Sequence, residues 1–187
     1  ASGETFQEVE EQIRGFMQEG YRHVRAQVSI PGLGTYGAGG EKTASEAPEN
    51  RRTRVWEPRP YVRTVPRLFE HLRSQLGDEV ELLHDVHERV PPNLAIQLAK
   101  DLEPYRLFFL EDPFSPEDVG FFTQLRQQTS TPIAMGELFN NPNEWLPLVS
   151  GRLIDFIRVH ISQVGGLTPA RKMAAMSEFF SVRTAWH

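Results

Sequence analysis

The chain has 187 residues, a formal net charge of -5 at pH 7 and no cysteine. This length can bury a sizeable core in one domain, and the acidic balance leaves no global positive field for nucleic acid or an anionic membrane. The lack of cysteine excludes disulfides and thiolate-bound metals. No apolar run approaches the roughly 20 residues that cross a bilayer, and the first residues lack the basic-then-apolar pattern of a signal peptide. A cytoplasmic protein is compatible with these features.

Helical and strand-like segments alternate along the chain. Thr5 and Glu8 form a capping box before an amphipathic helix that Gly20 ends. The runs that read as strands, each separated from the next by a helical segment, are YRHVRAQVSI, VELLHDV, YRLFFLEDP, TPIAMGEL, IDFIRVHIS and SVRTAWH. Such alternation is typical of βα units around a parallel sheet, and the apolar runs indicate strands buried on both faces.

These elements predict an α/β fold whose parallel sheet could be open or closed; if it is closed, the chain is an incomplete TIM-like barrel. A complete barrel of eight units takes about 250 residues, whereas six strands are expected here. A strand is also expected before the first helix, where the chain instead opens in a turn. We therefore expect residues 1–187 to be part of one barrel domain. The segment at about 29–63 is rich in glycine, proline and charge and is expected to be a long active-site loop.

Three acids follow successive strand-like runs. Asp85, Glu111 and Glu137 are separated by equal intervals of 26 residues. Because the carboxyl ends of parallel strands share one face of a barrel, these carboxylates should converge there. Their mutual repulsion and their oxygen donors favour a hard cation, Mg²⁺. Any one of them could equally be a helix N-cap, but capping does not require one acid per strand at constant spacing.

Two histidines and an arginine lie near the same strand ends. If the strand continues, His87 faces the same way as Asp85 and is a candidate for proton transfer, whereas His84 faces the opposite side. By the same parity Arg158 and His160 lie on one face. Either could meet an anionic substrate, and Arg158 could equally pair with a metal carboxylate.

Arg25 is expected to end the first predicted strand, and Tyr36 lies in the glycine-rich loop. A tyrosine becomes a usable base only if a cation lowers its pKa, and Arg25 could be that cation. Alternatively, Arg25 pairs with a nearby acid and Tyr36 only packs in the loop.

The motifs HDVHER, FFLEDP, MGELFNNPNEW, IRVHISQVGGLTPARK and VRTAWH together resemble the enolase superfamily. Within it they are similar to the mannonate dehydratase group, which includes proteins described as starvation-sensing. The resemblance covers nearly the whole chain. It implies a modified (β/α)₇β barrel, with the N-terminal capping domain, the first barrel strand and the last strand missing here.

The resemblance also implies roles for single residues. Mg²⁺ would bind Asp85, Glu111 and Glu137, and an arginine–tyrosine pair that removes the proton α to the carboxylate would be Arg25 and Tyr36. His87 would protonate the departing 3-hydroxyl. The positions that contact substrate are matched by Arg158 and His187, with His160 close by. The Lys-x-Lys motif of other branches is replaced by HVRAQV, which removes a lysine base.

The leading hypothesis is a Mg²⁺-dependent dehydratase that converts D-mannonate to 2-keto-3-deoxy-D-gluconate. One alternative is the same reaction on another hexonate such as D-gluconate. A second is a non-catalytic homologue that binds sugar acids or regulates another process. The expected partner is a small acid sugar, and the family implies a homo-oligomer.

Overall fold

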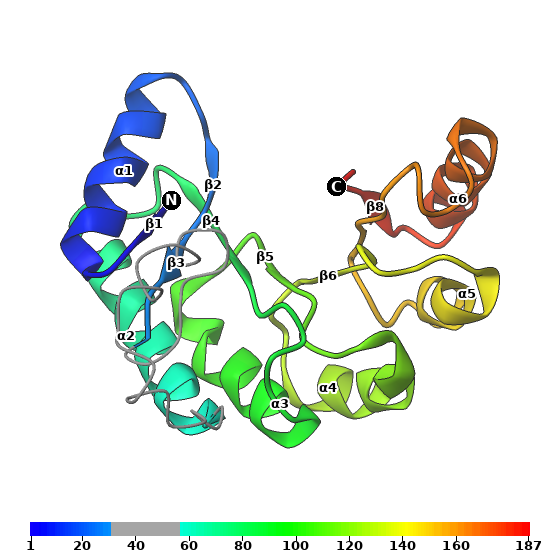
Figure 1. The fold of residues 1–187 in the computed structure, drawn as a ribbon, viewed down its shortest axis with the longest axis horizontal. Helices are drawn as coiled ribbons and strands as arrows, with labels where there is room; N and C mark the ends of the chain where they lie inside the picture. Colours follow the sequence, from blue (N-terminus) through cyan, green and yellow to red (C-terminus); the bar gives the residue numbers. More distant parts are fainter. Residues whose placement is uncertain (31–56) are drawn as a thin grey trace, which may run out of the picture. The chain divides into compact units, whose positions relative to one another are not determined.

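The computed structural model describes residues 1–30 and 57–187. The chain divides into two compact units, Ala1–His84 and Asp85–His187. Their strands and helices can be followed by colour along the chain in Figure 1. No helix of the described ranges has both the length and the apolarity needed to cross a membrane.

The first unit pairs short parallel strands beside two long helices. Its elements are β1 (Ser2–Gly3), α1 (Phe6–Gln18), β2 (His23–Arg25), β3 (Gln27–Val28), α2 (Pro58–Leu76) and most of β4 (Glu81–Asp85). β1 pairs with β3, and β2 pairs with β4, both in parallel. The expected capping box of Thr5 and Glu8 is present at the start of α1, and Gly20 follows that helix with φ 95°.

A buried histidine fixes the side of β4 that faces the core of this unit. His84 Nδ1 lies 2.8 Å from the Ala26 carbonyl oxygen, and the Tyr61 hydroxyl of α2 lies 2.7 Å from Nε2. A carbonyl can only accept, so Nδ1 donates to Ala26, and Nε2 is left to bond with the Tyr61 hydroxyl. His84 is therefore a buried core residue, on the side of the strand opposite Asp85 as predicted.

The second unit repeats strand and helix. Its elements after β4 are α3 (Pro92–Asp101), the 3₁₀ turn η3 (Glu103–Tyr105), β5 (Phe109–Glu111), η4 (Pro116–Phe121), α4 (Phe122–Gln128), β6 (Ile133–Met135), α5 (Pro142–Ser150), β7 (Phe156–Ile157), α6 (Leu167–Phe179) and β8 (Arg183–Thr184). Strands β5, β6, β7 and β8 pair in sequence order, all in parallel. Parallel order brings their carboxyl ends to one edge of the sheet.

All the strands expected from apolar runs are present, but three details of the prediction are wrong. YRHVRAQVSI is divided between β2 and β3, because β3 pairs with β1. The opening residues form β1 rather than a turn alone. Finally, α2 begins at Pro58, before the expected end of the loop at about residue 63, while residues 31–56 of that loop lie outside the described residues.

Candidate metal and acid–base site

The predicted acids lie where the strands of the second unit end. Asp85 is the last residue of β4, Glu111 is the last residue of β5, and Glu137 follows β6 after Gly136. They are 1%, 1% and 5% exposed, respectively. Buried carboxylates are costly unless charge or hydrogen bonds compensate them, so this edge of the unit is built to hold positive charge.

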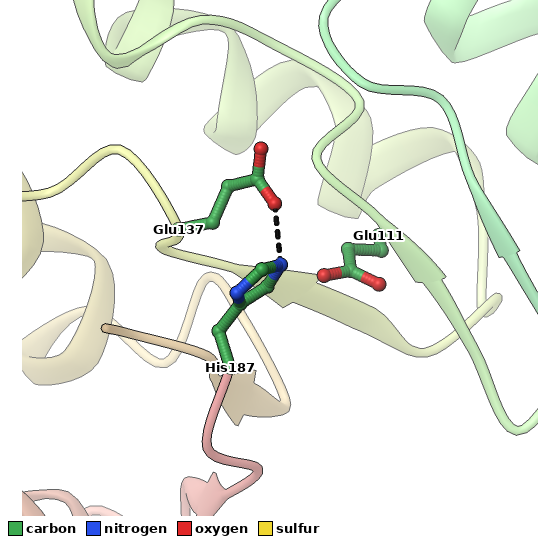
Figure 2. A group of neighbouring side chains, drawn as sticks. All are labelled: Glu111, Glu137 and His187. Atoms are coloured by element: carbon green, nitrogen blue, oxygen red, sulfur yellow. Dashed lines mark ion pairs between the residues drawn. The ribbon is translucent and has the colours of Figure 1, made fainter. Parts of the chain in front are cut away.

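Two of these acids meet a histidine at the end of the described chain. Donor atoms of Glu111, Glu137 and His187 lie within 4.8 Å of one another. Figure 2 shows the two carboxylates reaching the imidazole of His187 from different strand ends. His187 Nε2 lies 2.7 Å from Glu137 Oε2, although the contact lacks the alignment of a hydrogen bond. Asp85 is not a member of this group, so the predicted trio of carboxylates stays a prediction.

The donor set suits a divalent cation. Ligands on opposite sides of Mg²⁺ are about 4.2 Å apart at an ion–oxygen distance of about 2.1 Å, so small side-chain movements bring Glu111 and Glu137 into range. Carboxylate oxygens are the donors that Mg²⁺ prefers, and no thiolate competes with them. The residues therefore fit an oxygen-bound divalent ion, with His187 at the edge of the set.

Arg158 compensates one of the buried acids. Its Nε is ion-paired with Glu111 Oε1, and its Nη1 donates to the Trp186 carbonyl oxygen at 2.9 Å. Of the two roles left open for Arg158, the structure supports the pairing with a carboxylate of the predicted metal site. His160 packs against His187, with their ring centroids 4.0 Å apart.

His87 reaches the acids by a route different from the one expected. β4 ends at Asp85, so strand parity does not apply to His87. Instead its backbone turns into the left-handed region, with φ 57°. This turn places His87 Nδ1 3.1 Å from Glu137 Oε1. His87, the residue predicted to transfer a proton, thus lies beside a predicted metal ligand, although the sequence analysis expected Asp85 as its neighbour.

Two further acids, Glu88 and Asp112, were not among the predicted site residues. Burial raises the pKa of Glu88 to about 7, and the carboxylates of Glu137, Asp85 and Glu117 add to this shift. Burial also raises the pKa of Asp112 well above its usual range, with Glu111 the next cause, while a hydrogen bond from Gly136 opposes the rise. The signal was present in the sequence, since each follows a predicted site residue directly in HER and LEDP.

The strand ends share an uncommon backbone. His87 and Glu88 after β4 both have φ 57°, Asp112 after β5 has φ 43°, and Gly136 after β6 has φ 141°. Positive φ at residues other than glycine costs about 1–3 kcal/mol and is concentrated at functional sites. The turns that leave these strands are therefore held in place by their surroundings.

The residues predicted to act as the base are Arg25 and Tyr36. Arg25 ends β2 in the first unit, as expected, and its carbonyl oxygen accepts from the Ala1 amino group at 2.7 Å. Tyr36 lies outside the described residues. A hollow of about 830 Å³ over α6 and β8 is lined by Arg171, Glu178 and other residues, none of them a predicted site residue. The buried donors, rather than that hollow, therefore mark the candidate site.

Comparison with known proteins identifies relatives along the whole chain. A D-galactonate dehydratase family member of Musicola paradisiaca (strain Ech703) is 50% identical, over 96% of this chain and 46% of that protein. One from Enterocloster bolteae is 44% identical, over 100% of this chain and 46% of that protein. The chain thus spans about half the length of the curated relatives it matches.

Solved structures agree with these relatives. An enolase from Pantoea ananatis with bound D-gluconate and Mg is 47% identical with a TM-score of 0.87, over 100% of this chain and 48% of that one. L-Talarate dehydratase from Polaromonas sp. JS666, complexed with Mg and L-glucarate, is 28% identical with a TM-score of 0.63, over 67% of this chain and 35% of that one. The predicted fold class, part of an α/β barrel, is confirmed.

The resemblance to the enolase superfamily is confirmed as well. The closer relation to mannonate dehydratases stays a prediction, since the curated relatives are named as D-galactonate dehydratase family members. A family model described as enolase C-terminal domain-like matches residues 8–187. Because that match spans nearly the whole chain, the chain belongs to the enolase C-terminal domain-like family of the enolase superfamily.

Proposed function

We propose that the protein carrying this chain is a Mg²⁺-dependent acid-sugar dehydratase, with D-mannonate as its substrate and 2-keto-3-deoxy-D-gluconate as its product. The observation that carries the proposal is the meeting of the buried carboxylates of Glu111 and Glu137 beside His187 and His87. The names of the curated relatives support dehydration of a hexonate.

Glu111, Glu137 and Asp85 are the proposed metal ligands. The close approach of donor atoms supports Glu111 and Glu137, and Asp85 is proposed as the third ligand. When bound, Mg²⁺ stabilises the negative charge that develops on the substrate carboxylate as its α proton leaves. Arg158 holds Glu111 oriented through its ion pair. It also adds positive charge at the edge where an anionic sugar acid would bind.

His87 is the proposed general acid. A protonated imidazole beside Glu137 is stabilised by that carboxylate, and it donates its proton to the 3-hydroxyl as the C–O bond breaks, so that water leaves rather than hydroxide. Arg25 and Tyr36 remain the proposed base for the α proton, on the family resemblance alone. His187 and His160, whose rings contact each other, are proposed to contact the substrate.

D-Gluconate is the second candidate substrate, because the similar enolase from Pantoea ananatis contains it. D-Gluconate and D-mannonate differ only at C2, whose configuration is lost in the reaction, so both give the same keto acid. D-Galactonate gives a product that differs at C4. D-Mannonate and D-gluconate can therefore be told apart only by their rates of turnover. Turnover of D-galactonate can be recognised by its different product.

The test is release of keto acid by the full-length protein from these three hexonates, with Mg²⁺ and with a chelator in its place. We expect turnover with Mg²⁺ that the chelator abolishes, and the highest kcat/KM for D-mannonate. If no hexonate is turned over but hexonates raise the melting temperature, the protein is a non-catalytic sugar-acid-binding homologue and the proposal is wrong.

A further inference from the structure

Asp112 connects the turns that follow three neighbouring strands of the second unit. It comes directly after Glu111 and is fully buried. Its backbone N–H donates to the Ala134 carbonyl oxygen of β6 at 3.0 Å, and its carbonyl oxygen accepts from Glu88 N, beyond β4, at 3.0 Å. The backbone of this one residue is therefore fixed between the strand end that carries Asp85 and the strand that precedes Glu137.

Its side chain makes a further connection. Gly136 N–H donates to Asp112 Oδ1 at 3.1 Å in a buried hydrogen bond. Gly136 is the residue immediately before Glu137, so the bond holds the Met135–Gly136 peptide, one peptide before the backbone of Glu137. Oδ2 of Asp112 is also buried and accepts no hydrogen bond from the described residues.

The backbone conformation of Gly136 and the space around it leave no room for a larger residue. Its φ of 141° suits glycine, and a Cβ at this position would lie 3.0 Å from Val159 Cγ1 and 3.1 Å from the Arg158 carbonyl oxygen. A larger residue would thus collide with the end of β7. The backbone at Gly136 depends on glycine for its shape and on Asp112 as the acceptor for its N–H.

We propose that Asp112 is a positioning residue for the cation site: by accepting the hydrogen of Gly136 N–H, its Oδ1 directs Glu137 toward Glu111 and His187. This inference rests on the metal-binding part of the proposed function. Asp112 does not touch substrate in this role. Groups that orient metal ligands in this way typically change metal affinity 10–100-fold when they are removed.

Two substitutions separate the hydrogen bond from the backbone strain. Asp112→Gly removes the acceptor but tolerates the φ of 43° observed at this position. Asp112→Asn keeps an acceptor oxygen of the same reach and also tolerates left-handed backbone. Leu98→Ala, a truncation of a buried residue of α3, is the control for general destabilisation.

The measurement is the Kd of Mg²⁺, with Mn²⁺ as a second probe, by titration calorimetry on the full-length protein and its variants. We expect Asp112→Gly to raise Kd by about 10–100-fold, Asp112→Asn to stay within about 3-fold of the wild type, and Leu98→Ala to lower the melting temperature without changing Kd. If Asp112→Gly does not fold, Asp112→Ala is measured against the same expectation.

Each other outcome contradicts a distinct statement. Wild-type Kd in Asp112→Gly, or a Kd in Asp112→Asn as weak as that in Asp112→Gly, overturns the positioning role alone. Failure of the wild type to bind either ion overturns the metal-binding part of the proposed function and this inference with it. Metal binding that depends on Asp112 but is followed by no dehydration leaves the inference standing and removes the catalytic proposal.

Discussion

Histidine and carboxylate have different proposed tasks although they touch. His87 Nδ1 is 3.1 Å from Glu137 Oε1, and Glu111 is held by Arg158. A residue that moves a proton can be replaced without losing the metal, whereas a metal ligand cannot. The two roles are therefore separable by mutation.

We expect His87→Asn to bind Mg²⁺ within about 3-fold of the wild type and to lose about 10²–10⁴-fold in kcat, the usual contribution of a general acid. Glu111→Gln should weaken Mg²⁺ binding itself. Calorimetry and turnover assays on the same samples check both, with His71→Asn on α2 as a matched control. Loss of metal by His87→Asn would show that His87 is a ligand.

Glu88 should make the metal-free protein sensitive to pH. Its pKa is raised from 4.5 to about 7, so between these values the folded state binds more protons than the unfolded chain. The stability from this group is fully present below pH 4.5 and is lost as the pH rises through about 7. Negative charge on Glu88 destabilises the fold above that range, because burial removes its hydration and, to a smaller extent, Glu137 and Asp85 repel it.

In the presence of a chelator, Glu88→Gln should therefore raise the melting temperature relative to the wild type at pH 8, and this advantage should vanish near pH 4.5. Thermal melts across this range check it. Glu178→Gln, at an exposed position of α6, is the control with the same change of charge. An equal pH dependence in the wild type and in Glu88→Gln would contradict the assignment.

The spacing of residues along the chain predicted which site residues lie at strand ends. It did not predict which side chains point toward one another. The interval of 26 residues placed Asp85, Glu111 and Glu137 at strand ends. It could not predict that a donor atom of His187 would lie within 4.8 Å of donor atoms of both glutamates. That outcome depends on rotamers and on Arg158, which no local pattern encodes.

Among the elements, α4 is tied to the amino ends of β6 and β7, away from the candidate site. Arg126 of α4 donates to the Leu153 carbonyl oxygen at 2.9 Å and pairs with Asp155. Asp155 Oδ2 in turn accepts from Ile133 N at 2.7 Å. One arginine thus connects a helix with the residues that precede or begin two strands.

Arg126→Ala should lower the free energy of unfolding by about 1–3 kcal/mol, since charged hydrogen bonds are lost and Asp155 keeps its charge. Denaturant titration measures this, and the Kd of Mg²⁺ should not change. Arg171→Ala, at an exposed position of α6, should change stability by less than about 0.5 kcal/mol. Equal effects of the two substitutions would show that the connection contributes little.

Apolar runs predicted which elements exist, but not their bounds. The run before Asp85 became β4, while the equally apolar run around Ala26 was divided because part of it pairs with β1. Which partner a strand finds is a tertiary matter, and propensity does not contain it. The start of α2 at Pro58 could not be predicted for another reason: the prolines there indicate a loop, although proline is tolerated in the first turn of a helix.

Taken together, the chain is part of an enolase-superfamily barrel domain whose charged edge should link metal binding to folding. An ion that binds only the folded state stabilises it by about 2.7 kcal/mol at a concentration 100 times its Kd. We therefore expect Mg²⁺ to raise the melting temperature of the full-length protein and a chelator to reverse the rise. Glu111→Gln should lose most of this rise at the same Mg²⁺ concentration, and an equal rise with NaCl at matched ionic strength would contradict it.

The uncommon φ angles after β4, β5 and β6 have a consequence for heat tolerance. These turns are held in unfavourable conformations by their neighbours. They should therefore be the first parts of the second unit to unfold locally on warming. The proposed activity should then be lost at a temperature below the melting temperature, while the apolar core is still folded. A bound cation should raise the temperature of activity loss more than it raises the melting temperature.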